Sequence, residues 1–270
     1  MNELEIQMLG LSRSGNHAIA DWIWLQARGP RLLLNCCEGK TNPYLSCRPM
    51  GPKSGGWRES EPGLFATGRD GRHVPKALLL HSYEDSWLRH AFSPALETHH
   101  NDWLGPSRRR VSLIVVRDPF NLFASRRRAG CAMPPHIERK MWKQHAKAAL
   151  GLVQNIPGEI CIIRYNDWAS DAGYRADLAH HLGLRFTDAG AERVPPTCGG
   201  SSFDGTAFEG RASAMATDER WQHFACDPAY RGLFDRELVM MSTQLFGPPP
   251  HGLGWDEMSD LQAVQSSASI

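Results

Sequence analysis

The apolar stretch at residues 111–116, VSLIVV, constrains the fold more than any other part of the chain. A short continuous apolar run is typical of a strand covered on both faces, as strands of a parallel sheet are. Strands that alternate with helices predict an α/β fold of three layers, with a central, mainly parallel sheet flanked by helices. Further strands are predicted at residues 3–11, 31–35, 77–80 and 160–164, and helices at residues 17–28, 120–128, 138–153 and 171–183.

A single domain is predicted over residues 1–257, because 270 residues with 41% hydrophobic content can bury one large core. Residues 36–75 are rich in Gly, Pro, Ser and Arg and have no sustained period, which predicts a long loop. Long loops often cover binding sites, so this one is a candidate lid, with simple disorder as the alternative. Helical segments are expected again near residues 216–224 and 230–245, and residues 258–270 are expected to form a flexible tail.

Composition excludes several classes of partner. The formal net charge of +1 argues against a general nucleic-acid binder, which normally carries a clear positive excess. The N-terminus lacks a basic, apolar leader and no run reaches the roughly 18 apolar residues of a membrane helix, so we expect a soluble, cytoplasmic protein without a membrane partner. Seven cysteines without framework spacing fit free thiols. A zinc site built from Cys36, Cys37, Cys47 and His73 lacks any C-x-x-C pair, and no metal is expected.

The loop GLSRSG, from Gly10 to Gly15, joins the first predicted strand to the first predicted helix. Its two glycines match the first part of a P-loop, in which backbone N–H groups at a helix N-terminus cradle phosphate oxygens. Asn16 and His17 stand where a nucleoside triphosphatase has lysine and then serine or threonine, so the usual phosphate contact and magnesium ligand are missing. This loop, residues 10–15, is called the cradle loop below. It is predicted to be a P-loop-like anion cradle with Arg13 beside it; the alternative is an ordinary strand-to-helix turn.

A second anion motif follows the apolar run. Arg117 comes directly after the strand, and Ser125 lies eight residues later on the next predicted helix. Because the carboxyl ends of parallel strands meet at one edge of a sheet, Arg117 and the cradle loop should open on the same crevice. The alternative role for Arg117 is an ion pair that caps the helix. The three arginines at residues 126–128 are expected to form a solvated helix face, with at most one of them touching phosphate.

These stretches resemble the sulfotransferases that use 3′-phosphoadenosine 5′-phosphosulfate, in particular soluble bacterial enzymes that modify natural products, including those that tailor saxitoxin. The family's K-S-G-T-T loop appears here within SRSGNH, and its R-[ND]-P strand end, with a serine eight residues after the arginine, appears as RDPFNLFAS. The segment IIRYNDW is similar to the family's R-Y-E-D segment, which supplies a tyrosine to the nucleotide site. The resemblance runs in order through residues 3–183; in the last third only FDGTAFEGRASAM is similar to the family's glycine-rich C-terminal motif.

The resemblance implies transfer of a sulfuryl group from 3′-phosphoadenosine 5′-phosphosulfate to a hydroxyl or nitrogen of a small-molecule acceptor, without a metal. Adenosine 3′,5′-bisphosphate would be the second product. Arg13, in place of the family's lysine, would stabilise charge on the leaving phosphate oxygen. A monomer or a homodimer is expected, with no nucleic acid bound. The residues implied in binding the cofactor are Arg13, Ser14, Gly15, Asn16, His17, Arg117, Ser125, Tyr165 and Arg211.

The acceptor must lose a proton, and histidine is suited to take it. His81 is the first candidate among 12 histidines, because it follows the apolar run KALLL and is expected at the strand edge, where the family has its base. His17, inside the loop, is the second candidate, with a purely structural role at the helix start as its alternative. Two other functions stay open. A small-molecule kinase would bind ATP and magnesium, and a non-catalytic nucleotide-binding module would be favoured by burial of His81.

Overall fold

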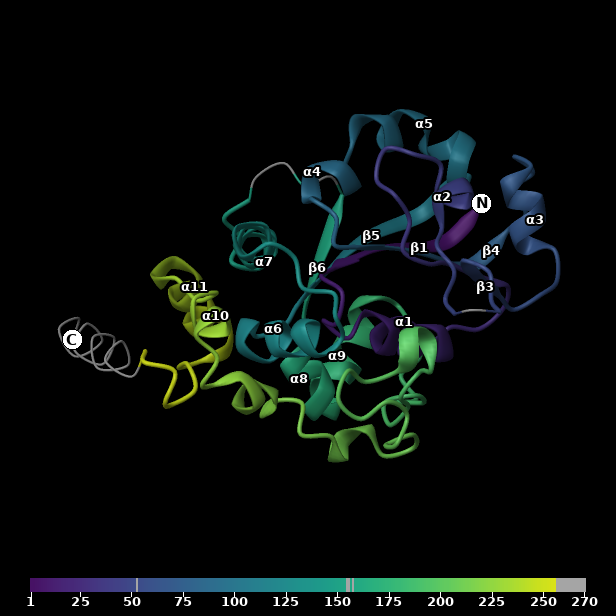
Figure 1. The fold of residues 1–270 in the computed structure, drawn as a ribbon. Coiled ribbons are helices and arrows are strands. Elements are labelled where there is room, and N and C mark those ends of the chain that lie inside the picture. The colour runs from purple at the N-terminus through teal and green to yellow at the C-terminus, as the bar shows by residue number, and fades with distance from the viewer. Residues whose placement is uncertain (52, 154–155, 157, 256–270) are drawn as a thin grey trace, which may run out of the picture.

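A six-stranded sheet forms the centre of the molecule. The computed structural model describes residues 1–51, 53–153, 156 and 158–255, and within them the strand order is β3-β2-β4-β1-β5-β6 (Figure 1). Neighbouring strands are parallel except β2 and β3, which are antiparallel. The predicted α/β fold with a mainly parallel sheet is therefore confirmed. The strands are β1 (Asn2–Gly10), β2 (Arg31–Leu34), β3 (Trp57–Glu59), β4 (Lys76–Glu84), β5 (Ser107–Val116) and β6 (Glu159–Arg164).

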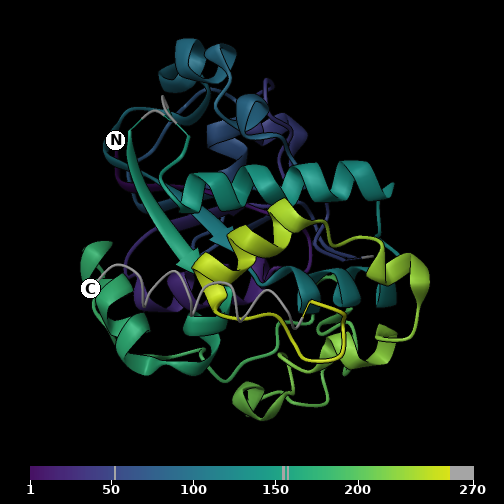
Figure 2. The same cartoon turned by 90° about the vertical axis from the view of Figure 1, so that its left-hand side faces the viewer.

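Helices cover both faces of the sheet and give the predicted three layers (Figure 1). One core cluster contains α1 (Asn16–Gln26), α8 (Tyr165–Ser170) and α9 (Ala172–His181). The other contains α2 (Pro43–Ser46), α3 (Leu64–Arg69), α4 (Leu88–Ala91), α5 (Pro94–Leu104), α6 (Pro119–Arg128), α7 (Pro135–Ala149), α10 (Pro228–Arg231) and α11 (Arg236–Phe246). Figure 2 shows α11, in yellow-green, running obliquely beside α7, in teal.

Strand β1 shows why both faces of the sheet have to be covered. Successive side chains of a strand point to opposite faces, so Ile6 and Met8 pack in the core of α1 while Leu9 packs in the opposite core. All three side chains are buried. Trp22 of α1 is also fully buried against this sheet, and its Nε1–H donates to Asp188 Oδ1 at 3.0 Å. The opening strand and helix are thus fixed on both sides of the loop that joins them.

Segment 36–75 differs from its prediction as a long loop. It contains α2, β3 and α3, and Tyr44, Leu64 and Phe65 from it are buried. These elements have three to six residues each, which is too short to produce a detectable period. The helix expected at residues 216–224 is also wrong, because only a 3-10 turn at Arg220–Phe224 is found there. The tail predicted at residues 258–270 lies outside the described residues.

Strand β4 is longer than predicted. It was expected at residues 77–80 with His81 at its edge, but it runs to Glu84 and pairs with strands on both sides. His81 lies opposite Gln7 of β1 and Leu34 of β2, so it stands inside the sheet. The carboxyl end of the strand, which faces the crevice, is therefore Glu84.

None of the helices in the described residues has the length and apolar character needed to cross a bilayer. No group of three or more metal-ligating side chains is found in the same residues.

Candidate functional site

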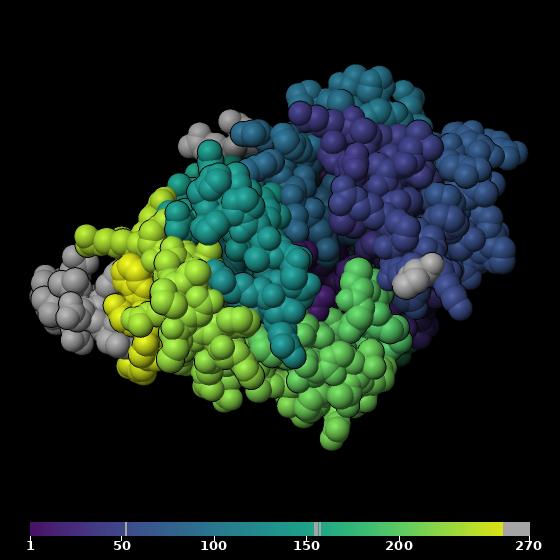
Figure 3. All heavy atoms as spheres, viewed as in Figure 1, coloured from purple at the N-terminus to yellow at the C-terminus, as the bar shows by residue number. Residues whose placement is uncertain are grey.

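A cavity of about 340 Å³ opens at the carboxyl ends of β1, β4 and β5. In Figure 3, dark purple atoms of the N-terminal segment lie at the bottom of a hollow between the teal and green segments. Its wall is formed by the cradle loop, by Arg117 directly after β5, and by residues of the segment 193–220. Of the predicted site residues, the cavity is lined by Arg13, Gly15, Asn16, His17, Arg117 and Tyr165.

The cradle loop has the backbone geometry of an anion site. Arg13 and Gly15 adopt left-handed φ values of 72° and 89°, and α1 begins after Gly15 with no side-chain cap. The first N–H groups of a helix have no partner inside the helix, so here they can bind an anion. Gly10 allows the loop to close, because a Cβ there would lie 2.3 Å from Asn16 Oδ1. The interpretation as an anion cradle fits this geometry better than an ordinary capped turn.

Replacing Gly15 by alanine is expected to destabilise the protein more than the same change at Gly130. Both glycines have a left-handed φ, which costs an alanine about 1 kcal/mol. A Cβ at Gly15 would also stand 2.2 Å from the Tyr165 ring, whereas nothing lies within 4 Å at Gly130. Overpacking should add about 1–3 kcal/mol to the Gly15→Ala cost. Denaturant unfolding measures both variants, and equal losses would show that Tyr165 moves aside freely.

Two buried arginines converge on one serine hydroxyl next to the cradle. Ser125 Oγ accepts from Arg117 Nη1 at 3.3 Å and from Arg220 Nη1 at 3.1 Å. Burial, and then the neighbouring Arg117, lower the pKa of Arg220 to about 10. The nearest carboxylate is Asp204, 3.4 Å from Arg220 Nη2, while Arg117 forms no ion pair within the described residues. Two like charges so placed favour the binding of an anion between them.

Several buried polar atoms around this point have no hydrogen-bond partner within the described residues. They include Ser14 Oγ, Asn16 Oδ1 and Arg117 Nε. Buried polar groups in proteins are nearly always paired, so these atoms mark a place where a polar ligand fits. Ser14 and Ser125 do not line the cavity themselves, and only 1% and 0% of their surfaces are exposed. The donors Ser14 Oγ–H and Arg117 Nε–H suit the oxygens of a phosphate group.

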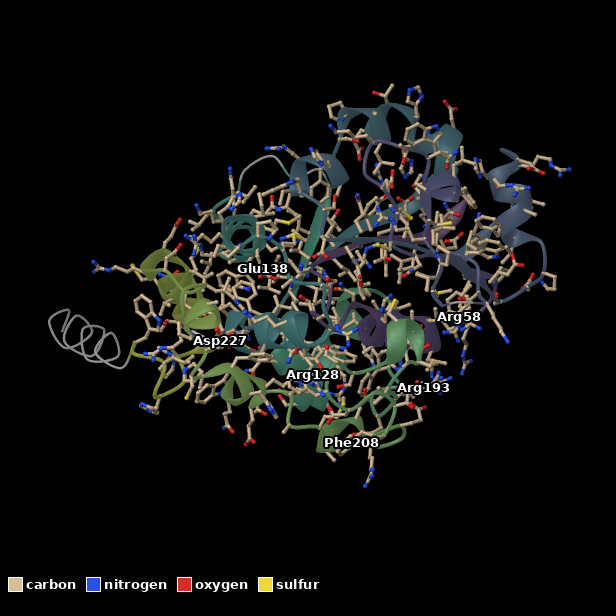
Figure 4. All side chains as sticks on the ribbon, viewed as in Figure 1. Arg58, Arg128, Glu138, Arg193, Phe208 and Asp227 are labelled. Atoms are coloured by element: carbon tan, nitrogen blue, oxygen red, sulfur yellow. The ribbon has the colours of Figure 1, made fainter. Side chains whose placement is uncertain are left out.

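The cavity wall also includes residues that sequence reasoning missed. Arg193 lines the cavity and lies 2.9 Å from Asp21 of α1, which Arg58 also contacts at 2.5 Å; Figure 4 labels both arginines. The segment 200–204 holds the cradle arginine, since Arg13 donates to Ser202 Oγ at 2.6 Å and to Gly200 O at 2.7 Å. This stretch lies about 190 residues from Arg13 in the chain, so no local pattern announces the contact.

Arg211 does not join the other predicted residues. Its side chain is exposed, its guanidinium stacks on the Phe208 ring at 5.1 Å, and it does not line the cavity. The arginine from the last third of the chain that contacts Ser125 is Arg220, which the sequence analysis did not select. Arg220 belongs to the turn Arg220–Phe224 and has no glycine motif around it, which is why it was missed.

His81 is fully buried and does not line the cavity. Its Nε2 lies 3.1 Å from Glu5 Oε1 and its Nδ1 lies 3.0 Å from Tyr83 Oη. Glu84, three residues further along β4, does line the cavity. Glu84 Oε1 accepts from Asn16 Nδ2 at 3.0 Å. The group at the carboxyl end of β4 is thus a carboxylate. Sequence analysis missed it because the apolar run stops at Leu80, while the strand continues through Ser82 and Tyr83 to Glu84.

His17 lines the cavity beside Glu84. Its Nε2 is 3.1 Å from Asn35 Oδ1 and 3.9 Å from Glu84 Oε1. The amide of Asn35 is oriented by the bond from its Nδ2 to Arg48 O at 3.0 Å, so its oxygen faces His17 as an acceptor. In a neutral His17 ring, Nε2 therefore carries the proton and Nδ1 the lone pair. Glu84 and His17 place a carboxylate and an imidazole in the cavity lining, and both types of group can accept a proton.

Glu5 is the centre of a polar cluster that does not line this cavity, which we call the Glu5 cluster. It contains the buried Glu5, His81 and His100 and the partly exposed Ser107 and Arg110. The Glu5 carboxylate, 1% exposed, accepts from His100 Nε2 at 2.8 Å and from Ser107 Oγ at 2.5 Å. Burial alone would raise the pKa of Glu5, but the hydrogen bonds from His100 and His81 hold it well below its usual range. This cluster explains why a histidine sits inside the sheet.

Comparisons with known proteins are sparse. No protein-family model and no curated protein matches the chain. Among solved structures, it is similar to the sulfotransferase domain of the Synechococcus PCC 7002 olefin synthase, with 14% identity over 92% of this chain and 96% of that one and a TM-score of 0.47. It is similar to the sulfotransferase domain of the curacin biosynthetic pathway, with 13% identity over 92% and 99% and a TM-score of 0.48. A mouse sulfotransferase complexed with PAP gives 9% identity over 98% and 89% and a TM-score of 0.42. The function of the site therefore rests on its own residues.

Proposed function

We propose that the chain transfers a sulfuryl group from 3′-phosphoadenosine 5′-phosphosulfate to a hydroxyl or nitrogen of a small-molecule acceptor, such as a natural product. One observation carries the proposal: a single cavity combines an uncapped helix N-terminus with a separate pair of buried arginines on Ser125. A nucleotide with phosphate groups on both its 5′ and 3′ positions needs two such anion sites, whereas ATP needs one extended site with a lysine and a magnesium ligand. Asn16 and His17 supply neither of the latter.

The chain's own residues divide the binding of this nucleotide between them. Backbone N–H groups at the start of α1 would hold the 5′ end, and Arg117, Ser125 and Arg220 the 3′-phosphate. The Tyr165 ring, 4.9 Å from the Arg117 guanidinium, flanks the same space. When bound, the nucleotide supplies the sulfuryl group. Arg13, which lines the cavity, would stabilise negative charge on the leaving oxygen.

Glu84 is assigned as the general base. It lines the main cavity and also a second cavity of about 200 Å³, which includes Cys36, Trp87 and His90. A small acceptor that enters from the second cavity meets the donor where Glu84 stands, and the carboxylate can take its proton. His17 Nδ1 is the neighbouring alternative. His81 lies outside both cavities and is left with a structural role.

The burial of His81 is also the observation that favours a non-catalytic nucleotide-binding module. Such a module would bind the same nucleotide without turnover on any acceptor. The two functions differ only in the chemistry at Glu84 and His17, so turnover in the unaltered protein decides between them. Release of adenosine 3′,5′-bisphosphate can be followed with hydroxyl- and amine-bearing probes such as 4-nitrophenol and benzylamine.

The proposal is tested by calorimetric titration without magnesium, using adenosine 3′,5′-bisphosphate, AMP and ATP in parallel. Micromolar binding of the bisphosphate with much weaker binding of AMP and ATP is expected, since only the bisphosphate engages both anion sites. Absence of bisphosphate binding, with ATP binding that requires magnesium, would overturn the proposal and favour a kinase.

Replacing Arg220 by glutamine is expected to weaken bisphosphate binding about 10- to 100-fold, the equivalent of one charged hydrogen bond. AMP binding should hardly change, because AMP has no 3′-phosphate. Arg211→Gln serves as the comparison, since Arg211 is exposed and does not line the cavity. The same titration measures both variants. A loss at Arg211 and none at Arg220 would restore the assignment made from the glycine motif.

A further inference from the structure

Arg126 is a fully buried charge that lines neither of the two cavities described above. It lies on α6, and its guanidinium donates in several directions at once. Nη1 donates to Ser12 O at 3.0 Å and to Asp85 Oδ1 at 2.8 Å. Nε donates to Glu138 Oε1 at 2.5 Å, and Nη2 donates to Cys131 O at 3.0 Å. A fork of five N–H donors allows this, and a lysine ammonium could not reproduce it.

Asp85, the residue directly after Glu84, completes the link to the cradle loop. Its carboxylate accepts from Ser12 N at 3.0 Å and from Ser12 Oγ at 2.8 Å. Its own backbone has a φ of 51°, which is left-handed and costly for a residue other than glycine. Its N–H donates to Gly10 O at 3.2 Å. The strained turn at the end of β4 is thus held against the beginning of the cradle loop by several contacts.

We infer that Arg126 is a positioning residue that locks the cradle loop to the end of β4, and so sets the distance between the bound donor and the base Glu84. The inference rests on the proposed function. Through Ser12 it fixes the loop that would hold the 5′ end of the nucleotide, and through Asp85 it fixes the residue next to Glu84. The reacting groups come from two different strands, and Arg126 is the charge that joins those strand ends.

The consequence of loosening this link is a loss of rate more than a loss of affinity. A displacement of about 1 Å between reacting groups can cost about 100-fold in rate. Arg117 and Arg220, which would hold the 3′-phosphate, do not contact Arg126 and keep their own hydrogen bonds. Arg126→Lys should therefore lower kcat roughly 10- to 100-fold, while the affinity for adenosine 3′,5′-bisphosphate falls by a smaller factor, because the 3′ site keeps its contacts.

Glu138→Gln is the matched control. Glu138, labelled in Figure 4, pairs with the same guanidinium from the α7 side and contacts neither Ser12 nor Asp85. The substitution Glu138→Gln removes one buried carboxylate from Arg126 but leaves its contacts with Ser12 of the cradle loop and Asp85 after β4 intact. A comparable loss of thermal stability with kcat close to that of the unaltered protein is expected. Equal loss of kcat in Glu138→Gln and Arg126→Lys would reduce Arg126 to a stabilising residue and overturn the inference.

Amide hydrogen exchange gives a readout that does not depend on sulfuryl transfer. In Arg126→Lys, the amides of Ser12 and Asp85 should exchange at least about tenfold faster together, while those of β5 stay protected. Unchanged exchange at both amides overturns the inference. If the unaltered protein neither binds the bisphosphate nor releases it from the donor, the proposed function fails. The exchange result still decides whether Arg126 couples the loop to the strand.

Discussion

Replacing Glu84 with glutamine is expected to lower the rate of sulfuryl transfer about 100- to 10,000-fold, while adenosine 3′,5′-bisphosphate binds as before. Glutamine has the same size and keeps an oxygen that can accept from Asn16 Nδ2, as Glu84 does now at 3.0 Å. It cannot accept the proton that the acceptor has to lose. The rate is measured as release of the bisphosphate in a single turnover with a probe acceptor, and the affinity by calorimetry.

Two histidine variants sharpen this test. His17→Gln removes the other proton acceptor of the cavity and should reduce the rate less than Glu84→Gln does. His81→Gln alters a residue outside the cavity, so its folded fraction should retain the rate. A severe loss in His17→Gln with a mild loss in Glu84→Gln would move the base to His17 Nδ1. If only the His81→Gln variant lost its transfer rate while folded, the assignment of Glu84 as the base would be contradicted.

Replacing Glu5 with glutamine is expected to lower the free energy of unfolding by about 3–5 kcal/mol, the usual cost of breaking a buried ion pair from one side. The change leaves the charge of His100 without its carboxylate, and it removes one of the two carboxylates of Arg110, which keeps Glu97. Glu3→Gln, two residues earlier on the same strand, is the control. Glu3 pairs with Arg108 at 3.3 Å, with 55% and 74% of their side chains exposed, so its loss should cost less than about 1 kcal/mol. Denaturant unfolding compares them.

The difference between the unaltered protein and Glu5→Gln should also depend on pH. The lowered pKa of Glu5 contributes stability above its unfolded value of 4.5, and this is lost as the pH falls through the folded value. Burial opposes charge on His100, but Glu5 raises its pKa above 6.5, so its contribution is complete below 6.5 and is lost at higher pH. The difference should therefore be largest between about pH 4.5 and 6.5. A difference that grows steadily toward pH 9 would contradict the pairing.

The parts of the site that the sequence predicts are those encoded by neighbouring residues. The cradle loop follows from a strand, two glycines and a helix within a few residues. Arg117 and Ser125 lie eight residues apart on one strand-to-helix connection, and their side chains meet. Arg220 reaches Ser125 from 95 residues away, so only the packing of the whole chain brings it there. Local spacing carries no information about such a contact.

The predicted position of His81 at the end of its strand was wrong for the same reason: the end of the strand depends on residues far away in the sequence. An apolar run reports where a strand is covered, and it ended at Leu80. Where the strand stops is decided by its neighbours, because β1 continues beside β4 as far as the pair Gly10 and Glu84. Polar residues such as His81 and Ser82 can therefore remain inside the sheet when buried partners form hydrogen bonds with them, as Glu5 does with His81.

The contacts of Arg13 and Arg220 with the segment 200–204 bear on which anions the cavity selects. Arg13 already donates to Ser202 and Gly200, and Arg220 to Ser201 and Asp204. An incoming anion must exchange these partners, so its affinity is the difference between two sets of hydrogen bonds. A lone sulfate or phosphate ion replaces the partners of one arginine at a time. A ligand with two anionic groups in one covalent frame replaces both, so we expect the segment to favour such ligands over inorganic sulfate or phosphate.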